Sequence, residues 1–409
     1  DSRNCPKGSI FFALKGDKFD GNQYAGKALA SGCVYAVIDN PDYYIGERTI
    51  LVDNVLKTLQ QLAHHHRKVL GLPIIGITGT NGKTTTKELL AAVLSTKFNL
   101  LYTEGNFNNH IGVPLTLLRL THDHEMAVIE MGASHPGDIK ELVDIVHPNY
   151  GIITNVGRAH LEGFGSFEGV IRTKGELYDY IRRSKGKIFI KKENEYLQSI
   201  AKGIEQITYG NGDDAFASGQ VVSCDPFLVF NWKQQGKLHT VETHMIGSYN
   251  LDNVLAAVAV GRFFKIPAER ISRAIAAYEP TNNRSQFKKT DNNELIIDAY
   301  NANPSSMKVA LDNFITMPVQ PKAIILGDMR ELGPTSDELH AEVVEQIKKG
   351  QFDKVFLCGE HFSKVGKEFS PFATTEAMVE ELRKQPLKGY HILIKGSHSM
   401  GLEKLADIL

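Results

Sequence analysis

The chain contains 409 residues, of which 42% are hydrophobic and 23% are charged, and its formal net charge at pH 7 is −1. This length predicts two or three globular domains, and the near-neutral charge supplies no general basic field, which argues against nucleic acid as a partner. No apolar run reaches membrane-spanning length and no signal peptide opens the chain, so we expect a cytoplasmic protein without membrane insertion. The four scattered cysteines lack CxxC spacing and fit reduced thiols better than disulfides or a zinc site.

A small α/β domain is expected at the start of the chain. The predicted strands lie at 8–14, 33–39 and 49–54, and the predicted helices at Tyr24–Ser31 and Val55–Leu70. Because the sequence begins at Asp1 without a methionine and enters strand-like residues directly, we expect that the true start of this domain is missing.

The main functional signal is PIIGITGTNGKTTTK, residues 73–87. A β-branched run breaks into a glycine-rich turn, after which Lys83 and three threonines open an amphipathic helix. Gly79 and Gly82 allow backbone N–H groups to approach an anion, Lys83 supplies a cation, and the hydroxyl of Thr84 can bind Mg²⁺. The pattern departs from GxxxxGK[ST] at the first glycine, but it predicts a nucleoside triphosphate site. The alternative is a strand-to-helix turn that binds nothing.

Two further polar residues are expected beside this loop. Strands and helices alternate from residue 73 onward, which is typical of a largely parallel sheet, and ligands bind at the carboxyl ends of such strands. Glu130 falls at the end of the run MAVIEM, and His160 follows the run YGIITNV. With Thr84 they are candidate metal ligands, although Mg²⁺ prefers oxygen and His160 is the weaker candidate. The alternative is that both are structural residues.

A neutral polar loop is predicted within GNFNNHIGVPLTLL, residues 105–118. Asn106, Asn108 and Asn109 lie between two glycines, and their amides are suited to amide or sugar groups of a substrate. The alternative is an asparagine-rich turn without a ligand.

Lys174 lies on the apolar face of a helix predicted at residues 167–183. A lysine in this position either extends its ammonium along the surface to the solvent or is drawn inward for chemistry. The spacing leaves both interpretations open.

The remaining residues are expected to complete a central domain and to add a third. Strands and turns are predicted at 186–245, a helix at 250–264 and a domain boundary at the break 278–280. Beyond it, the predicted strands lie at 294–300, 322–328, 354–359 and 391–396, and the predicted helices at 304–316, 335–349, 374–384 and 397–408. This alternation predicts a Rossmann-like doubly wound sheet, but no GxGxxG loop indicates a dinucleotide. The predicted domains are 1–71, 72–279 and 280–409.

These features together resemble the Mur ligases, the ATP-dependent amide-forming enzymes of peptidoglycan synthesis. The resemblance is carried by TGTNGKTT, by the strand ends at Glu130 and His160 and by the three-unit layout. Within that family, four segments are similar to those of members that add D-alanyl-D-alanine to UDP-N-acetylmuramoyl-tripeptide. They are GNFNNHIGVPLTLL at 105–118, IIDAYNANPSSM at 296–307, GDMRELG at 327–333 and KGSHSMGLE at 395–403.

The resemblance implies an α/β fold of three domains, which bind the UDP-substrate, ATP and the incoming dipeptide in that order, in a monomer. The residues implied in ATP binding are Gly79, Thr80, Asn81, Gly82, Lys83, Thr84, Thr85, Asn253, Arg284 and Asp298. The residues implied in catalysis are Lys83, Lys174, His160 and Arg284. Thr84, Glu130 and His160 are the implied ligands of Mg²⁺, of which two ions are expected, and Lys174 matches a lysine that is commonly carbamylated in the family.

The resemblance also implies substrate contacts. Ser2 and Arg3 match the uridine-nucleotide contact of a DSR motif, and the asparagines of the polar loop and of the NANP turn match substrate contacts. The asparagines of the NANP turn are Asn301 and Asn303, where the dipeptide is expected. Tyr249 replaces a histidine that the family usually carries, which puts the local adenine contact in doubt. Domain closure is expected, because Arg284 and Lys83 belong to different domains.

Three other interpretations compete. The chain could be another Mur-type amino-acid ligase or a folylpolyglutamate synthetase, which shares the GTNGK core. Its asparagine-rich motifs argue against both. It could also be a nucleotide-gated switch that hydrolyses ATP without forming a bond, but a switch does not need three substrate-shaped units around one phosphate loop.

Overall fold

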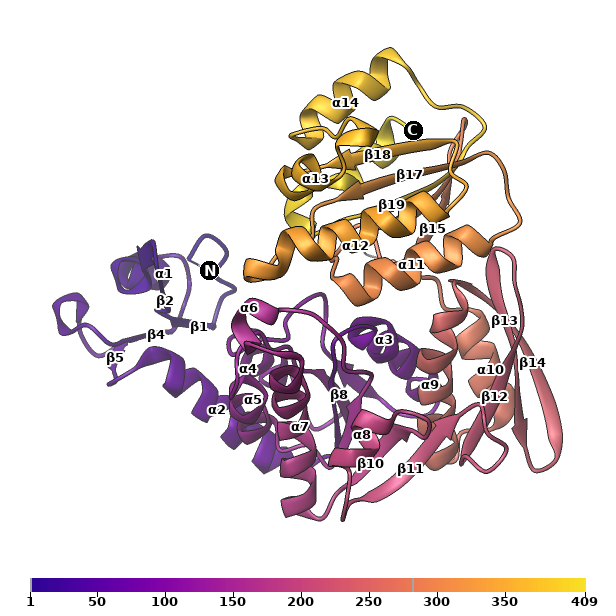
Figure 1. The fold of residues 1–409 in the computed structure, drawn as a ribbon. Coiled ribbons are helices and arrows are strands. Elements are labelled where there is room, and N and C mark those ends of the chain that lie inside the picture. Colours follow the sequence, from indigo (N-terminus) through magenta and orange to yellow (C-terminus); the bar gives the residue numbers. More distant parts are fainter. Residues whose placement is uncertain (1, 282) are drawn as a thin grey trace.

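A computed structural model describes residues 2–281 and 283–409, which form three α/β units, each with its own main sheet (Figure 1). In this view the first unit lies to the left of the central unit, and the third unit lies above it. The predicted α/β fold of three domains is confirmed.

The first unit is built on a parallel sheet in the order β1-β4-β5. Its elements are β1 (Ile10–Phe12), β2 (Lys15–Gly16), β3 (Phe19–Asp20), α1 (Ala25–Ala30), β4 (Tyr35–Ile38), β5 (Thr49–Leu51) and α2 (Val55–Leu70). The β2–β3 hairpin was not predicted, because strands of two residues carry no readable period. Helix α2 joins two units, since Val55 lies in the core of the first and Ala63 in the core of the central unit.

The central unit contains a nine-stranded sheet in the order β14-β13-β12-β11-β10-β9-β6-β8-β7. Its strands are β6 (Ile74–Thr78), β7 (Leu100–Tyr102), β8 (Met126–Glu130), β9 (Tyr150–Ile153), β10 (Lys187–Lys191), β11 (Glu205–Gly210), β12 (Ala217–Cys224), β13 (Phe227–Gln234) and β14 (Lys237–Ile246). The strands from β7 to β12 pair in parallel, and β13 and β14 add an antiparallel edge. The predicted mostly parallel sheet is therefore confirmed.

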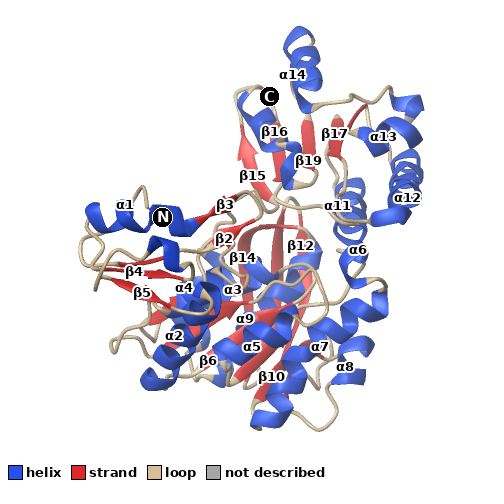
Figure 2. Ribbon diagram, turned by 90° about the vertical axis from the view of Figure 1, so that its left-hand side faces the viewer, coloured by secondary structure: helices blue, strands red, loops and turns tan. Residues whose placement is uncertain are grey.

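Helices cover both faces of this sheet (Figure 2). They are α3 (Lys83–Leu94), α4 (Gly112–Leu117), α5 (Asp138–Val146), α6 (Leu161–Phe164), α7 (Phe167–Ser184), α8 (Glu195–Ile200), α9 (Leu251–Phe263) and α10 (Ala268–Ala276). The side chains of β6 alternate between the two cores: Ile75 and Ile77 pack with α3 and α9, whereas Ile74 packs with α5 and α7. Burial on both faces explains why the strands are continuous apolar runs.

The third unit contains a five-stranded sheet in the order β15-β16-β19-β17-β18. Its elements are β15 (Gln286–Lys289), β16 (Glu294–Asp298), α11 (Pro304–Thr316), β17 (Lys322–Gly327), α12 (Ser336–Lys349), β18 (Lys354–Cys358), α13 (Glu360–Val365), α14 (Thr375–Lys384) and β19 (His391–Lys395). Ile296 packs with α11 and α12, whereas Leu295 and Ile297 pack with α14 on the other face. The sheet is doubly wound, as predicted, with β15 added antiparallel at one edge.

One predicted helix of the third unit is wrong. The segment expected to be helical at 397–408 forms two 3-10 helices, His398–Met400 and Leu402–Asp407. Gly401 lies between them with a φ angle of 64°, in the left-handed region that ends a helix. The apolar spacing of this segment does not distinguish an α-helix from consecutive 3-10 turns.

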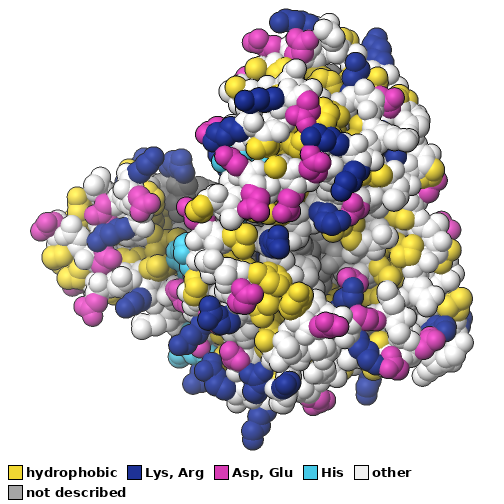
Figure 3. Space-filling model, viewed as in Figure 1, with side chains coloured by type: hydrophobic (Ala, Val, Ile, Leu, Met, Phe, Trp, Pro, Cys, Tyr) yellow, Lys and Arg dark blue, Asp and Glu magenta, His cyan; other side chains and the backbone are white. Residues whose placement is uncertain are grey.

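Acidic and basic side chains are interspersed over the face seen in Figure 3, in keeping with the net charge of −1. Within the part of the chain that the structure describes, none of the helices is long and apolar enough to span a bilayer.

The chain has one tryptophan, Trp232 in β13, which is fully buried in the central core with Leu255 of α9. We predict that Leu255→Ala lowers the free energy of unfolding by about 2–5 kcal/mol, because it leaves a cavity in this core. The measurement is urea unfolding followed by Trp232 fluorescence. The control Leu238→Ala, at a side chain that is 52% exposed, should change the free energy by less than about 0.5 kcal/mol. Equal losses in both variants would contradict the described core.

Candidate active site

A cavity of about 730 Å³ lies where the third unit meets the carboxyl ends of the central parallel strands. The central unit lines it with the loop after β6, part of the asparagine loop and the segments that follow β8 and β9. The third unit contributes Arg284, Asp298, Tyr300, Ser305 and Glu331 among others. The cavity therefore combines groups from two units.

The loop after β6 has the backbone shape of a phosphate-binding turn. The φ angles of Gly79 and Gly82 are 144° and 76°, in the region that favours glycine. A Cβ on Gly79 would lie 2.0 Å from Thr154 Oγ1, and one on Gly82 would lie 2.7 Å from Asn253 Oδ1. Helix α3 then begins at Lys83, with first-turn N–H groups that have no partner within the helix. Together these features suit an anion.

Lys83 is folded back over this loop. Its Nζ donates hydrogen bonds to the carbonyl oxygens of Gly79 (2.8 Å) and Thr80 (2.9 Å). Burial lowers the pKa of Lys83 to about 8; the Glu130 carboxylate opposes this shift and Arg284 adds to it. An anion bound in the cavity would offset the repulsion between the two cations.

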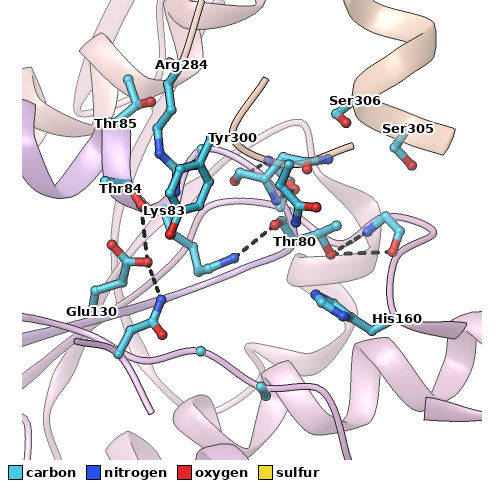
Figure 4. Close-up of a pocket in the computed structure, with 18 of the residues that line it drawn as sticks. Thr80, Lys83, Thr84, Thr85, Glu130, His160, Arg284, Tyr300, Ser305 and Ser306 are labelled. Atoms are coloured by element: carbon cyan, nitrogen blue, oxygen red, sulfur yellow. Dashed lines mark hydrogen bonds between the residues drawn. The ribbon is translucent and has the colours of Figure 1, made fainter. Parts of the chain in front are cut away.

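Glu130 and Thr84 form an oxygen-rich side of the cavity (Figure 4). Thr84 Oγ1 donates to Glu130 Oε1 at 3.3 Å, and Asn108 Nδ2 donates to the same oxygen at 2.8 Å. Glu130 is 1% exposed, and its Oε2 is buried without a hydrogen-bond partner among the described residues. A buried carboxylate oxygen without a partner needs a cation or a donor, so this donor set fits Mg²⁺.

His160 lies apart from Glu130 in Figure 4 and pairs with the third unit instead. Its Nδ1 shares a hydrogen bond with Glu331 Oε2, and the backbone N–H of Glu162 donates to the Glu331 carbonyl at 3.4 Å. Burial lowers the pKa of His160; Glu331 opposes the shift and Lys83 adds to it. Across residues 2–281 and 283–409, no three His, Cys, Asp or Glu side chains are grouped to hold a metal ion. Glu130 and His160 line the same cavity but bond to different partners, so their sharing of a metal ion stays a prediction.

The first turn of α11 lies against the phosphate loop. Asn303 caps this helix, since its Oδ1 accepts from the Ser306 N–H at 2.9 Å, while its Nδ2 donates to Asn81 Oδ1 at 2.8 Å. Nearby, the Arg158 N–H donates to Ser305 Oγ at 3.0 Å. The third unit therefore closes the cavity directly over the loop.

Asp298, the last residue of β16, lines the cavity and is held at both oxygens. Oδ2 accepts from Lys395 Nζ at 2.5 Å, and Oδ1 accepts from the Ser285 backbone N–H at 3.2 Å. Each oxygen keeps a further lone pair that could accept a ribose hydroxyl. Arg284, one residue before Ser285, places its guanidinium carbon 3.7 Å from the centre of the Tyr300 ring.

Lys174 is 2% exposed, so the solvent-extended interpretation of this lysine is wrong. Its Nζ donates to the Ala133 carbonyl at 3.3 Å and lies 5.2 Å from the centre of the Phe164 ring. Burial lowers its pKa well below the ordinary value, Lys83 adds to this shift and Asp138 opposes it. Ala133 lines the cavity, and Lys174 lies directly behind it.

Comparisons with known proteins match the chain in three segments. Residues 1–67 match "Mur ligase family, catalytic domain", residues 77–261 match "Mur ligase middle domain", and residues 283–398 match "Mur ligase, glutamate ligase domain". The chain is also 34% identical to the UDP-N-acetylmuramoyl-tripeptide--D-alanyl-D-alanine ligase of Bacillus subtilis, with 100% of this chain and 92% of that protein covered. The chain belongs to the Mur ligase family. It is therefore an ATP-dependent ligase that forms an amide bond.

Further relatives agree with this assignment. This Mur ligase is 32% identical to the enzyme of the same name from Escherichia coli, over 100% of this chain and 92% of that protein. A crystal structure of MurF from Acinetobacter baumannii is similar with a TM-score of 0.90 at 30% identity, covering 100% of this chain and 92% of that chain. MurF from Thermotoga maritima in complex with ADP is similar with a TM-score of 0.89 at 25% identity, covering 100% and 95%.

The asparagine loop of this Mur ligase reaches the cavity only in part. Asn108 and Asn109 line the cavity, whereas Asn106 is exposed and outside the lining. Asn108 orients Glu130, and Asn109 Oδ1 accepts from the backbone N–H groups of Ile111 (3.1 Å) and Gly112 (2.8 Å). Asparagine side chains readily bond to nearby backbone groups in this way, which composition alone did not reveal.

The other residues predicted to contact ATP or substrate include some that line the cavity and some that lie outside it. Asn253 Oδ1 accepts from Thr86 Oγ1 at 3.1 Å, so this residue supports the phosphate loop. Asn301 lines the cavity, and its Oδ1 accepts from the N–H of the next residue at 2.9 Å. Ser2 and Arg3 lie in the first unit, outside the cavity lining, and Asp1 of the DSR motif lies outside the described residues.

The cavity residues that were not predicted to have a role include Tyr249, Tyr300, Glu331 and Lys395. Tyr249 was noted only as a departure from the family, and its hydroxyl shares a hydrogen bond of 2.8 Å with Ser285 Oγ of the third unit. The other three lie within motifs that the sequence analysis quoted without assigning them chemistry. For these three residues, their place in a quoted motif was the sequence signal that could have indicated a role.

We predict that Gly79→Ala weakens ATP binding at least about 10-fold, because its Cβ would meet Thr154 Oγ1 at 2.0 Å and the loop must shift. Calorimetric titration gives the dissociation constant. The control Gly26→Ala in α1, where the nearest atom is 3.5 Å away, should bind ATP normally. Unchanged affinity in the Gly79 variant would contradict the described loop geometry.

Proposed function

We propose that this Mur ligase joins D-alanyl-D-alanine to UDP-N-acetylmuramoyl-tripeptide at the expense of ATP, in the synthesis of peptidoglycan precursors. The observation that supports this most directly is full-length similarity to ligases of that name, at 31–34% identity for the first seven of them. The cavity supports it independently, because a phosphate loop and a second unit meet there around one space.

The chemistry requires such a site. A carboxylate is a poor acyl donor, so its oxygen first attacks the γ-phosphorus of ATP, and ADP leaves from an acyl phosphate. The dipeptide amine then attacks the acyl carbon, and the resulting tetrahedral intermediate expels phosphate as the amide forms. Two anions have to meet in the first step, which positive charge and exclusion of water both favour.

Lys83 and Arg284 are proposed to supply this charge from opposite sides of the cavity. Lys83 and the N–H groups of residues 79–85 would hold the ATP phosphates, and Asp298 and Asn253 would hold the nucleoside side. Glu130 and Thr84 would hold Mg²⁺, which neutralises phosphate charge when bound. His160 is the third proposed metal ligand; its Nδ1 bonds to Glu331, which leaves Nε2 to bind the ion.

Each unit is proposed to bind one substrate. Residues 1–71 would bind the UDP-substrate, with Ser2 and Arg3 as contacts, and residues 72–279 would bind ATP. Residues 280–409 would bind the dipeptide. Asn301 and Asn303 of the NANP turn, with Asn106, Asn108 and Asn109 of the facing loop, are the proposed peptide contacts.

We place this reaction in the cytoplasm, since its co-substrates are ATP and a nucleotide-activated sugar, and we propose that the enzyme acts as a monomer.

The alternatives have less support. A folylpolyglutamate synthase from Mycobacterium tuberculosis is similar with a TM-score of 0.66 at 13% identity, and a UDP-N-acetylmuramoyl-L-alanyl-D-glutamate--2,6-diaminopimelate ligase with 0.56 at 17%. At these identities the likeness concerns the fold alone. An ATPase switch would release phosphate without any dipeptide.

The dependence of phosphate release on the dipeptide distinguishes a ligase from an ATPase switch. Purified protein with ATP, Mg²⁺ and UDP-N-acetylmuramoyl-tripeptide should release phosphate only after D-alanyl-D-alanine is added. Acceptors ending in lysine and in diaminopimelate should be tested in parallel. Phosphate release without dipeptide would support the switch, and release with a different amino acid would support another ligase.

We predict that Lys83→Ala lowers phosphate release about 100-fold or more without unfolding the protein, because the ammonium acts on phosphate charge. The pKa of Lys83 is about 8, so its charge is present below that pH and lost as the pH rises through it. The affinity for ATP should therefore fall above about pH 8. Lys83→Arg keeps its charge and should give a flatter profile in calorimetric titrations from pH 7 to 9.5. An equally steep fall in both proteins would contradict this assignment.

We propose that Lys174 is carbamylated: its neutral amine adds to CO₂, and the carbamate forms with loss of one proton. Burial favours the neutral amine, and the product would supply oxygen ligands for a second Mg²⁺. We predict that Lys174→Ala loses about 100-fold in activity, and that a small added carboxylate partly restores it. Electron density should extend beyond Nζ in the parent enzyme. Arg172→Ala, at an exposed position of the same helix, should remain active. A fully active Lys174→Ala enzyme would contradict the proposal.

A further inference from the structure

The ring of Tyr300 contacts two side chains of the third unit. On one face, the guanidinium carbon of Arg284 lies 3.7 Å from the ring centre (Figure 4). The imidazole of His398 stacks on Tyr300 as well, with 5.6 Å between the ring centres and an angle of 26° between the planes. The stack Arg284–Tyr300–His398 connects the cavity to the segment KGSHSM, for which the proposed reaction has so far given no role.

The guanidinium needs such support, because none of the carboxylates that the structure describes pairs with its charge. No carboxylate forms an ion pair with Arg284 in residues 2–281 and 283–409, and its Nε is buried without a hydrogen-bond acceptor. Arg284 also faces another cation, since it disfavours the charged form of Lys83. Without a bound anion, repulsion would move the arginine away from the cavity.

Stacking suits this task better than an ion pair would. The face of a tyrosine ring attracts a guanidinium, and the contact is stronger where water is partly excluded. A stacked guanidinium keeps the N–H groups on its edge free for a phosphate, whereas a carboxylate partner would occupy them.

The turn that carries Tyr300 is fixed at both ends by one buried residue. The Nζ of Lys395 donates to Asp298 Oδ2 at 2.5 Å and to the Asn301 carbonyl at 3.2 Å. Lys395 is 1% exposed, and it lies three residues before His398. The segment 395–398 therefore holds the turn through Lys395 and contacts the ring through His398.

We propose that Tyr300 is a positioning residue that holds Arg284 for the phosphates, and that residues 395–398 hold Tyr300 for this purpose. The inference deepens the proposed function and rests on the role of Arg284 in it. Tyr300 acts through the arginine and does not itself touch the reacting atoms.

The first test compares variants of the ring. Tyr300→Leu should lower kcat about 10-fold and leave the KM for the dipeptide within about 2-fold, whereas Tyr300→Phe keeps the ring face and should stay within about 2-fold in both. Tyr196→Leu, at an exposed tyrosine of α8, is the matched control and should be unchanged. Equal losses in the Leu and Phe variants would overturn the proposal.

A double-mutant cycle separates positioning from a general structural effect. In an Arg284→Ala background, Tyr300→Leu should cause less than about a further 2-fold loss, because there is no guanidinium left to hold. A further 10-fold loss would overturn the inference. If Tyr300→Leu does not fold, His398→Ala removes the exposed support instead, and its loss in kcat should likewise vanish in the Arg284→Ala background.

Binding of tripolyphosphate distinguishes this role from stacking of adenine on the ring. If Tyr300 positions Arg284, Tyr300→Leu should weaken tripolyphosphate and ATP by the same factor. Weaker binding of ATP alone would show that the ring holds the base and would overturn the inference. The role of Arg284 in the proposed function is tested separately. A fully active Arg284→Ala enzyme would contradict that role. If Arg284→Ala is inactive but Tyr300→Leu is fully active, only the role of Tyr300 is contradicted.

Discussion

Two cations in one cavity, supplied by two different units, are the constraint on which this structure depends. Lys83 follows a strand of the central sheet, and Arg284 lies at the start of the third unit. Their repulsion opposes closure until an anion arrives. Contacts away from the charges offset it: Asn303 bonds to Asn81 and so joins the cap of α11 to the phosphate loop. Closure is thus stabilised by neutral groups, while the charges stay available to a ligand.

The features that the sequence predicted well are those that neighbouring residues determine. The strand, turn and helix around residues 73–87 follow from apolar spacing, glycine placement and the polar helix start, and all three are present. The alternation after residue 290 predicted a doubly wound sheet for the same reason, because side chains on both faces of its strands are buried. The β2–β3 hairpin and the 3-10 turns around Gly401 were not predicted, because these elements are too short to show a recognisable hydrophobic period.

The candidate site could be predicted only residue by residue, not as an arrangement. Asn81 and Asn303 are 222 residues apart in the chain, and His160 and Glu331 are 171 apart. The residues next to them in the sequence do not predict these contacts, because a contact between two units depends on how the units pack against each other. Lys174 shows the same limit: its helical spacing indicated an apolar face, but its partner Ala133 came from a distant strand end.

Helix α2 restricts how the first unit can move. Its first residue, Val55, packs in the core of the first unit, and Ala63 in its second half packs in the core of the central unit. The helix has 16 residues and is about 24 Å long, so it connects the two cores rigidly. Gly71, at the C-terminal end of the helix, could act as a hinge residue, but the packed helix lies between Gly71 and the first unit. Rotation in the residues just before Val55 would pull this side chain, which is 1% exposed, out of the first core. A change of angle between the two units therefore has to bend this helix or repack its contact with one of the two cores.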